Sequence, residues 1–327
     1  MAWTPVLPES ARSAPAPAAC TAMPLTHLAV VQASGADATA FLHSQLSNDV
    51  QGLPPQRSLL AGYCNAKGRL FTISRLWRHG DAWLLCLPAD SAETLLKRLR
   101  MFVLRSKVTL TLRQDLTLFG VSGDAAATAL GRAGLPAPDQ DGSVATHDDT
   151  SVLCLPGTVP RYLLCLTDAV APATWTALTE VARPADTGYW RLLEIDAGQP
   201  SVHAATAETF VPQHVNLERV DGVSFRKGCY PGQEIVARMH YLGKPSRRMY
   251  RMQTTAPPPP PGTAVQDERQ REVGTVVDAQ ATGTDATRLL AALQVAAIDS
   301  PLLLPDGARL ERLDLPYPLE APDSAEA

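Results

Sequence analysis

Two short apolar runs of nearly the same composition stand 79 residues apart in this chain. Residues 83–87 read Trp-Leu-Leu-Cys-Leu, and residues 162–166 read Tyr-Leu-Leu-Cys-Leu. Each run has the length of a buried strand, in which a thiol serves as a small hydrophobe, and each precedes a segment with the spacing of an amphipathic helix. This repeat predicts two related strand-then-helix units. Because hairpins lie between strands and helices, we expect an α+β fold rather than a doubly wound parallel sheet.

Composition divides the chain into regions of different expected order. Residues 1–24 contain five prolines and many alanines without periodicity, which predicts a flexible tail. The repeated units occupy 25–246, which we expect to form the main α+β region. The five prolines of 257–261 predict a stiff spacer between compact bodies. Short strand patterns around them predict a small β-barrel over 247–320, followed by a flexible acidic tail over 321–327.

The overall composition is that of a globular chain, with 327 residues of which 45% are hydrophobic. The first 22 residues lack the basic start and apolar core of a signal peptide, and no stretch reaches about 18 apolar residues. Six cysteines occur without the spacing of zinc or iron–sulfur sites. We therefore expect a cytoplasmic protein with reduced thiols, no metal site and no membrane partner.

Residues 227–234, Lys-Gly-Cys-Tyr-Pro-Gly-Gln-Glu, gather a cation, a thiol, two glycines and a carboxylate. The Pro231-Gly232 pair fits the central positions of a type II turn. If residues 233–240 then form a helix, Cys229 lies near a helix N-terminus and beside two cations, where positive charge favours thiolate over thiol. The functional interpretation is a reactive, partly exposed sulfur. The alternative is structural, with Cys229 as a small buried residue beneath the turn.

Charge is distributed unevenly along the chain. The net charge is −4, yet residues 226–251 carry seven cations and one acid, a local excess of six positive charges. Such a region can receive a polyanion, whether a glutamate tail, a phosphate or RNA. The alternative is a solvated strand-and-loop edge protected by charge. Three tyrosines in this region are too few for a single-strand stacking platform.

The run KGCYPGQEIVAR at 227–238 resembles the signature of the YgfZ family, folate-binding proteins related to the glycine-cleavage aminomethyltransferase, the T-protein. Further blocks follow the same order as in the family. They are FLHSQLSNDV at 41–50, CNAKGR at 64–69, SKV at 106–108, EIDAG at 194–198 and VPQHVNL at 211–217. The resemblance covers roughly 34–297. It implies two interwoven T-protein-like α+β domains and a C-terminal barrel around a central opening where folate binds.

The resemblance also implies site residues for tetrahydrofolate or a one-carbon derivative. Asp196 stands where relatives usually carry a glutamate for the pterin, and a carboxylate can accept two parallel hydrogen bonds from the pterin 2-amino group and N3. Without the resemblance, Asp196 would be interpreted as a turn residue. Cys229 with Lys227 is implied as the reactive group, within the motif glycines Gly228 and Gly232. The other implied cofactor-binding residues are Gln213, Asn216, Tyr230, Gln233, Glu234 and Arg238.

Three functions are compatible with these features. The first, implied by the resemblance, is a folate-binding accessory protein that supports assembly or repair of iron–sulfur enzymes, including tRNA-modifying ones. Its partners would be iron–sulfur client or assembly proteins. The second is an aminomethyltransferase acting with a lipoyl carrier, against which the cysteine-bearing loop argues. The third is an RNA-binding or tRNA-modifying protein that uses the basic region 226–251.

Overall fold

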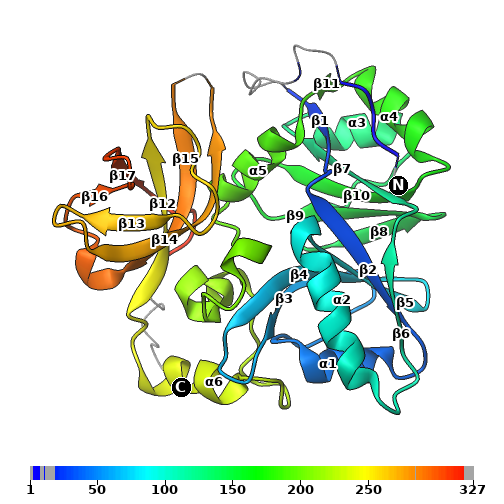
Figure 1. The fold of residues 1–327 in the computed structure, drawn as a ribbon. Coiled ribbons are helices and arrows are strands. Elements are labelled where there is room, and N and C mark those ends of the chain that lie inside the picture. Colours follow the sequence, from blue (N-terminus) through cyan, green and yellow to red (C-terminus); the bar gives the residue numbers. More distant parts are fainter. Residues whose placement is uncertain (1–2, 8–10, 12–18, 284, 320–327) are drawn as a thin grey trace, which may run out of the picture.

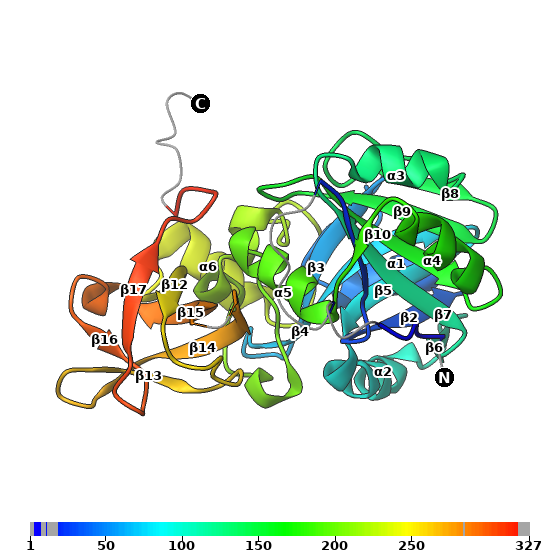
Figure 2. The same cartoon turned by 90° about the horizontal axis from the view of Figure 1, so that it is seen from above.

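The computed structural model describes residues 3–7, 11, 19–283 and 285–319. Two α+β lobes lie together on one side of the molecule and a β-barrel lies on the other, as Figures 1 and 2 show from two directions. The two repeated units form the lobes, and the C-terminal segment forms the barrel. The α+β architecture expected from the sequence is therefore confirmed.

The first lobe is an antiparallel five-stranded sheet, in the order β3-β4-β5-β2-β6, with two helices on one face. Leu85 of β5 packs with Leu42 and Leu95 of the helices, whereas the neighbouring Cys86 points to the opposite face because strand side chains alternate. The elements are β2 (Leu28–Ser34), α1 (Ala38–Gln45), β3 (Ser58–Cys64), β4 (Leu70–His79), β5 (Ala82–Pro88), α2 (Ala89–Val103) and β6 (Thr109–Arg113).

The second lobe repeats this arrangement in a six-stranded sheet of order β11-β1-β7-β10-β9-β8. Leu164 of β10 packs with Trp175 of a helix, and Cys165 faces the first lobe in the same core as Cys86. Burial raises the pKa of both thiols, so they are small core groups. The elements are β1 (Thr21–Pro24), β7 (Leu116–Ser122), α3 (Ala126–Arg132), β8 (Val144–His147), β9 (Thr150–Leu155), β10 (Arg161–Thr167), α4 (Ala171–Thr179) and β11 (Arg183–Pro184).

The lobes are interwoven because the chain enters the second sheet before it builds the first. Strand β1 lies between β7 and β11, with Thr21 opposite Ser122. The flexible tail predicted over 1–24 is therefore wrong for its last residues. Met23 is fully buried, and a strand of four residues buried on both faces carries no alternation that a sequence pattern can reveal. The prediction is also wrong for Trp3, whose amide donates to Asp168, and for the buried Ala11 and Cys20. Residues 1–2, 8–10 and 12–18 of that prediction, and the tail over 321–327, lie outside the described residues.

A second internal repeat explains the exchange of β1. The runs SGADATAFL at 34–42 and SGDAAATAL at 122–130 join a strand to a helix in each lobe. Gly35 and Gly123 have φ of 113° and 119°, and a Cβ on them would lie 2.2 Å and 2.4 Å from the carbonyl oxygens of Lys107 and Ala19. Lys107 precedes β6 and Ala19 precedes β1. Strand β1 therefore completes the second lobe as β6 completes the first.

The C-terminal segment closes into a six-stranded barrel in the order β12-β15-β14-β13-β16-β17, which confirms the predicted barrel. The proline run 257–261 lies between β12 and β13, inside the barrel domain. Its prediction as a spacer between bodies is wrong, because β12 already pairs with β15 and β17. The strands are β12 (Arg247–Thr254), β13 (Ala264–Asp267), β14 (Glu272–Ala281), β15 (Thr287–Gln294), β16 (Leu302–Leu303) and β17 (Arg309–Leu313).

Short helices connect the lobes to the barrel. Residues of the first sheet, of the connecting helices and of β12 and β15 share one core, which includes Cys64, Val215 and Met249. Among the described residues, no helix has the length and apolar character needed to cross a membrane. The connecting helices are α5 (Thr187–Asp196), η2 (Ala204–Thr206), η3 (Pro212–Val215), η4 (Leu217–Val220), α6 (Gln233–Leu242) and η5 (Val295–Ala297), the last within the barrel.

A buried charge cluster ties the barrel to the first lobe. His203 lies 3.5 Å from Asp90 of α2 and 3.7 Å from Asp278 of β14, and Arg191 of α5 forms an ion pair with Asp278. Burial alone would lower the pKa of His203, but Asp278 and Asp90 outweigh burial and raise it. The two carboxylates therefore favour the protonated imidazole at this junction.

We expect His203→Gln to destabilise the fold most where the imidazole is protonated. A raised folded-state pKa stabilises the fold fully below the unfolded pKa of about 6.5, and that contribution is lost as pH rises through the folded value. The predicted loss is about 1 kcal/mol at about pH 6 and smaller at about pH 9. Urea denaturation of both proteins measures it, and an equal loss at the two pH values would contradict the assignment.

Candidate functional site

The loop 227–232 makes the tight reversal that its sequence predicts. Gly232 has φ 80° and ψ 2°, the values of the second central residue of a type II turn, and α6 begins at the next residue as expected. A Cβ on Gly232 would lie 2.4 Å from the Asn65 carbonyl oxygen and 2.5 Å from the Cα of Gly68. Glycine is therefore required both by the backbone conformation and by close packing on the β3–β4 hairpin.

Lys227, which the sequence places beside the thiol, anchors the loop to the first lobe. Its Nζ donates hydrogen bonds to the carbonyl oxygens of Leu46, at 2.7 Å, and of His43, both at the end of α1. The ammonium also lies 4.9 Å from the ring centroid of Tyr230. Burial lowers the pKa of Lys227 to about 8, although Asp49 and Cys229 oppose the shift. The cation satisfies carbonyls that the helix leaves free.

Lys227→Met should cost about 1–3 kcal/mol of unfolding free energy, because two carbonyl groups lose a charged donor while the apolar stem is kept. Lys244→Met is the matched control, since Lys244 is an exposed lysine just after α6 and should change stability by no more than about 0.5 kcal/mol. Urea denaturation compares the two. Equal stability of both variants would show that the anchor contributes nothing.

Cys229 is exposed, whereas the other five cysteines, all within the described part of the chain, are buried. The alternative of a small residue buried beneath the turn does not hold. A Cβ on the adjacent Gly228 would meet only Nε2 of His43, at 3.9 Å, so the loop leaves room beside the thiol. Cys64 of β3 belongs to the core, and burial raises its pKa to about 12. A partner that reaches this surface therefore meets Cys229 alone among the thiols.

The other predicted residues of this segment divide between the loop and the surface of α6. Tyr230 is buried, and burial raises its pKa, so it fills the inside of the turn. Gln233 donates a hydrogen bond to the Lys227 carbonyl at 3.5 Å. Glu234 and Arg238 are exposed one turn apart on α6. Tyr230 and Gln233 thus shape the loop, while Glu234 and Arg238 face solvent.

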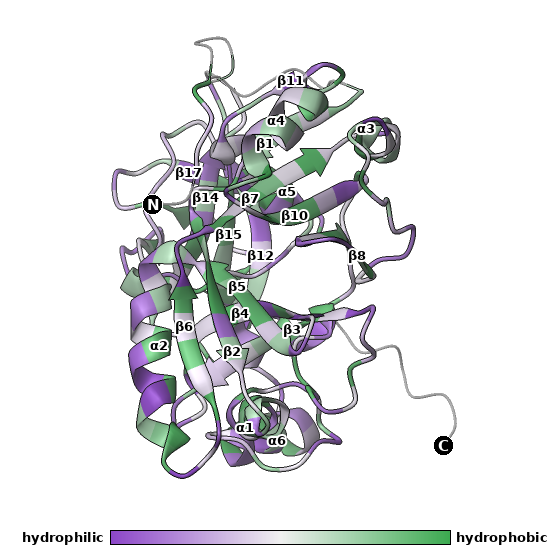
Figure 3. Ribbon diagram, turned by 90° about the vertical axis from the view of Figure 1, so that its right-hand side faces the viewer, coloured by the Kyte–Doolittle hydropathy of each residue, from purple (hydrophilic) through white to green (hydrophobic). Residues whose placement is uncertain are grey.

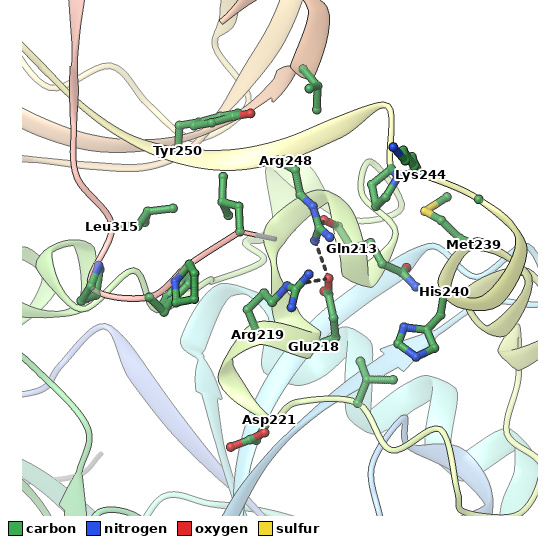
Figure 4. Close-up of a pocket in the computed structure, with 18 of the residues that line it drawn as sticks. Gln213, Glu218, Arg219, Asp221, Met239, His240, Lys244, Arg248, Tyr250 and Leu315 are labelled. Atoms are coloured by element: carbon green, nitrogen blue, oxygen red, sulfur yellow. Dashed lines mark hydrogen bonds and ion pairs between the residues drawn. The ribbon is translucent and has the colours of Figure 1, made fainter. Parts of the chain in front are cut away.

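A separate cleft of about 1440 Å³ opens between the connecting helices, α6, β12 and the segment that follows β17. Figure 4 shows side chains from these distant parts of the sequence pointing into one space. Polar and aromatic groups both contribute to its wall. They include Gln213, Glu218, Arg219, Phe225, His240, Lys244, Arg248, Tyr250, Arg312 and Tyr317.

Two buried acceptors in the cleft wall lack hydrogen-bond donors. Glu218 pairs with Arg248 and lies 3.7 Å from Arg219, yet its Oε2 accepts no hydrogen bond. Gln213 donates from Nε2 to the Val236 carbonyl at 2.8 Å, and its Oε1 is also unpartnered. Buried acceptors without donors are uncommon because they cost free energy. These two oxygens are therefore unsatisfied acceptors in the wall of the cleft.

Flat rings and cations complete the cleft. The rings of Phe225 and His240 stack with centroids 3.7 Å apart and planes inclined by 10°. Burial lowers the pKa of His240, which favours the neutral imidazole. Lys244 and Arg312 lie elsewhere in the lining. The cleft therefore suits a planar, donor-bearing ring system with an anionic extension.

Asp196 and Asn216 hold the barrel to the rest of the molecule. Oδ2 of Asp196 pairs with Arg288 at 2.5 Å and Oδ1 lies 3.5 Å from Arg251, both from barrel strands. Asn216, at φ 56°, donates to the Met249 carbonyl at 2.7 Å and accepts from the Met249 amide at 3.3 Å. Of the predicted cofactor-binding residues, only Gln213 lines the cleft.

The basic region 226–251 is less uniform than its sequence indicates. Three of its cations already have partners within the protein. Lys227 donates to the end of α1, Arg248 pairs with Glu218, and Arg251 pairs with Asp196. The four remaining cations are Arg226, Arg238, Lys244 and Arg247. The region therefore offers a smaller positive surface to a partner than the count of residues suggests.

Sequence reasoning missed Glu218 and the cleft. Glu218 stands in an unremarkable Leu-Glu-Arg-Val run, and the groups opposite it come from β12 and from residues 312–319. No local pattern joins these segments. The unusual pairing of a buried carboxylate with two arginines becomes visible only in the folded chain.

No protein-family model matches the chain. A curated protein called tRNA-modifying protein YgfZ, from Sodalis glossinidius, is 36% identical over 230 residues, which cover 70% of this chain and 70% of that protein. The chain belongs to the YgfZ family. The YgfZ protein of Edwardsiella ictaluri is 32% identical over 313 residues, covering 92% of this chain and 95% of its own length. The family resemblance seen in the sequence is thus confirmed.

Among solved structures, the glycine cleavage system aminomethyltransferase T from Bartonella henselae resembles this chain with a TM-score of 0.73. The superposition covers 92% of this chain and 86% of that protein at 17% sequence identity. At this identity the likeness shows the fold alone. It confirms the T-protein-like arrangement of two interwoven lobes and a barrel expected of a YgfZ-family chain.

Proposed function

We propose that this YgfZ-family chain binds tetrahydrofolate or a one-carbon derivative and serves as an accessory protein for iron–sulfur enzymes that modify tRNA. The observation that carries the proposal is Cys229, an exposed thiol on a loop that Lys227 and Gly232 hold rigidly to the first lobe. Curated relatives at 32–36% identity are called tRNA-modifying proteins, which supports the second half of the proposal.

The cleft supports folate binding through three kinds of group. The pterin 2-amino group and N3–H are donors that fit the free oxygens of Glu218 and Gln213. The pterin ring can lie against the His240–Phe225 stack, and the glutamate carboxylates can reach cations of the lining. Bound folate would supply a carrier for a one-carbon unit.

Glu218, rather than Asp196, is our choice for the carboxylate that meets the pterin. Each acid has one oxygen without a hydrogen bond, but that oxygen of Asp196 lies 3.5 Å from Arg251, whereas Oε2 of Glu218 has no ion pair. Glu218 lines the cleft, whereas Asp196 lies at the end of α5 between two barrel arginines, Arg251 and Arg288. Removing the charge of Asp196 should therefore loosen the barrel junction more than it weakens the ligand.

Cys229 is proposed to present its sulfur to an iron–sulfur partner. The thiol faces solvent and does not line the cleft, so folate and partner can be bound together. A reducing cytoplasm would keep the sulfur available as thiol or thiolate. The chain itself then needs to catalyse no aminomethyl transfer.

The proposal is tested in a bacterium that lacks its own YgfZ protein. Expression of this chain is expected to restore the modified nucleosides of tRNA, measured by mass spectrometry of digested tRNA. A normal level of folded protein without restoration would contradict the accessory role. In a parallel assay with aminomethyl-lipoyl carrier and tetrahydrofolate, we expect no ammonia, and steady ammonia release would assign the chain to aminomethyl transfer instead.

A further inference from the structure

The C-terminal end of α2 exposes apolar side chains to solvent. Met101 and Phe102 are exposed, and Leu104 is 86% exposed. Leu104 also has φ 42°, a conformation that side-chain-bearing residues rarely adopt. A strained backbone that holds a leucine in water indicates a role outside the folded core.

Cations surround the apolar surface formed by Met101, Phe102 and Leu104, here called the apolar tip of α2. Residues 97–107 contain five lysines and arginines and no acid. Arg98 covers the ring of Phe71 at 3.5 Å, and Arg100 donates to the Leu110 carbonyl at 2.8 Å. Three further cations, Lys97, Arg105 and Lys107, are exposed. The tip therefore combines apolar surface with positive charge.

The same chemistry recurs on α6, next to the reactive loop. Tyr241 and Leu242 are 65% and 83% exposed, and Ile235 is also exposed. The cations beside them are Arg226, Arg238 and Lys244. Six of the nine exposed large hydrophobic residues of the described chain belong to these two tips.

Helix α1 joins the two tips into one face. At its start, the Lys107 amide donates to Asp37 Oδ2 at 2.7 Å, and at its end the carbonyl of Leu46 holds Lys227. An eight-residue helix spans about 12 Å. Figures 1 and 3 both show α6, α1 and the end of α2 at the lower end of the molecule. The loop of Cys229 thus lies on this α2–α6 face.

We propose that the α2–α6 face docks a folded protein whose facing surface is acidic with an apolar centre. The inference rests on the proposed function in that Cys229, within the face, would meet the same partner. Apolar tips surrounded by cations favour a protein over RNA, because phosphates pair with cations but gain nothing from Leu104 or Leu242. The positive charge would steer an acidic partner and fix its orientation.

The first test removes the apolar tip. Phe102→Ser combined with Leu104→Ser is expected to lower the restored tRNA modification by about fivefold or more, since central apolar contacts dominate protein interfaces. The matched control is Val6→Ser with Val170→Ser, two exposed apolar residues outside the tips and outside the cleft lining, which should restore modification fully. Folate affinity should be unchanged in both, which also shows that both variants fold. Full restoration by the tip variant would overturn the proposal.

The second test separates the occupants of the face. Arg105→Glu with Lys107→Glu should lower tRNA modification as strongly as the tip variant. Binding of total tRNA to the purified protein is measured for both variants. If the charge-reversal variant loses this binding and the apolar variant keeps it, the face binds RNA and the proposal of a protein partner is overturned. A dimer in solution that the tip variant dissociates would assign the face to a second copy instead. If Cys229→Ser remains active while the face variants fail, the reactive-thiol proposal falls and the docking face stands.

Discussion

Replacing Glu218 with glutamine is expected to weaken tetrahydrofolate binding by roughly 10- to 100-fold, because a hydrogen bond to a charged acceptor contributes about 1.5–3 kcal/mol. The change keeps the shape of the side chain, removes its charge and replaces one acceptor oxygen with an NH2 donor. Oε1 of Glu218 pairs with Arg248, whereas Oε2 accepts no hydrogen bond within the protein and is the oxygen proposed to meet the ligand donor. Anaerobic fluorescence titration gives the affinity of each variant.

Two controls make this prediction specific. Asp221→Asn removes another carboxylate from the cleft lining and should change affinity little, because Asp221 is exposed to water. Asp196→Asn should weaken the ion pairs with Arg251 and Arg288, and so lower stability more than affinity. A larger affinity loss from Asp196→Asn than from Glu218→Gln would return the pterin to Asp196 and refute the cleft assignment.

Cys229→Ser is expected to abolish restoration of tRNA modification while leaving stability and folate affinity at wild-type values. The thiol is exposed and makes no core contact, so a hydroxyl in its place leaves the fold intact. Oxygen cannot replace sulfur as a soft ligand or nucleophile toward an iron–sulfur partner. Mass spectrometry of tRNA nucleosides measures the loss of modification, and urea denaturation of the purified variant measures its stability.

Thiol labelling provides an independent control on the same residue. In the native protein one of the six cysteines should react rapidly with an exposed-thiol reagent, and the other five only after denaturation. The fast reaction should disappear in Cys229→Ser. An active Cys229→Ser protein, or a fast reaction that persists in it, would remove Cys229 from the functional account.

Local chemistry made much of the fold predictable from the sequence. The repeated apolar runs gave the two related lobes, the Pro-Gly pair gave the turn, and strand patterns gave the barrel. The predictions that were wrong depended on contacts between residues far apart in the sequence. Strand β1 has four residues, too few to show the alternation of buried and exposed residues that identifies a strand. It also belongs to the lobe that the chain builds later, and the equivalent contacts of Gly35 and Gly123 that show this are seen only in the structure. The proline run looked like a boundary, although the strands before and after it, β12 and β13, belong to one barrel.

The site was predicted in part for the same reason. The exposure of Cys229 follows from the tight turn beside it, which is a local property. The partners of Lys227 and Asp196 are not local, since they lie 181 and 92 residues away on Leu46 and Arg288. The charged side chains of Lys227 and Asp196, which we predicted to act on ligands, therefore hold the lobes, the loop and the barrel together. Glu218 became a candidate only when its neighbours were known.

We propose that this chain holds a folate site and a separate reactive thiol. Anaerobic calorimetric titration of tetrahydrofolate into the wild-type protein, Glu218→Gln and Cys229→Ser tests it most directly. We predict about one bound folate per wild-type chain, the same affinity in Cys229→Ser and greatly weakened binding in Glu218→Gln. No binding to the wild-type protein, or binding that disappears with Cys229→Ser while Glu218→Gln keeps it, would contradict the account.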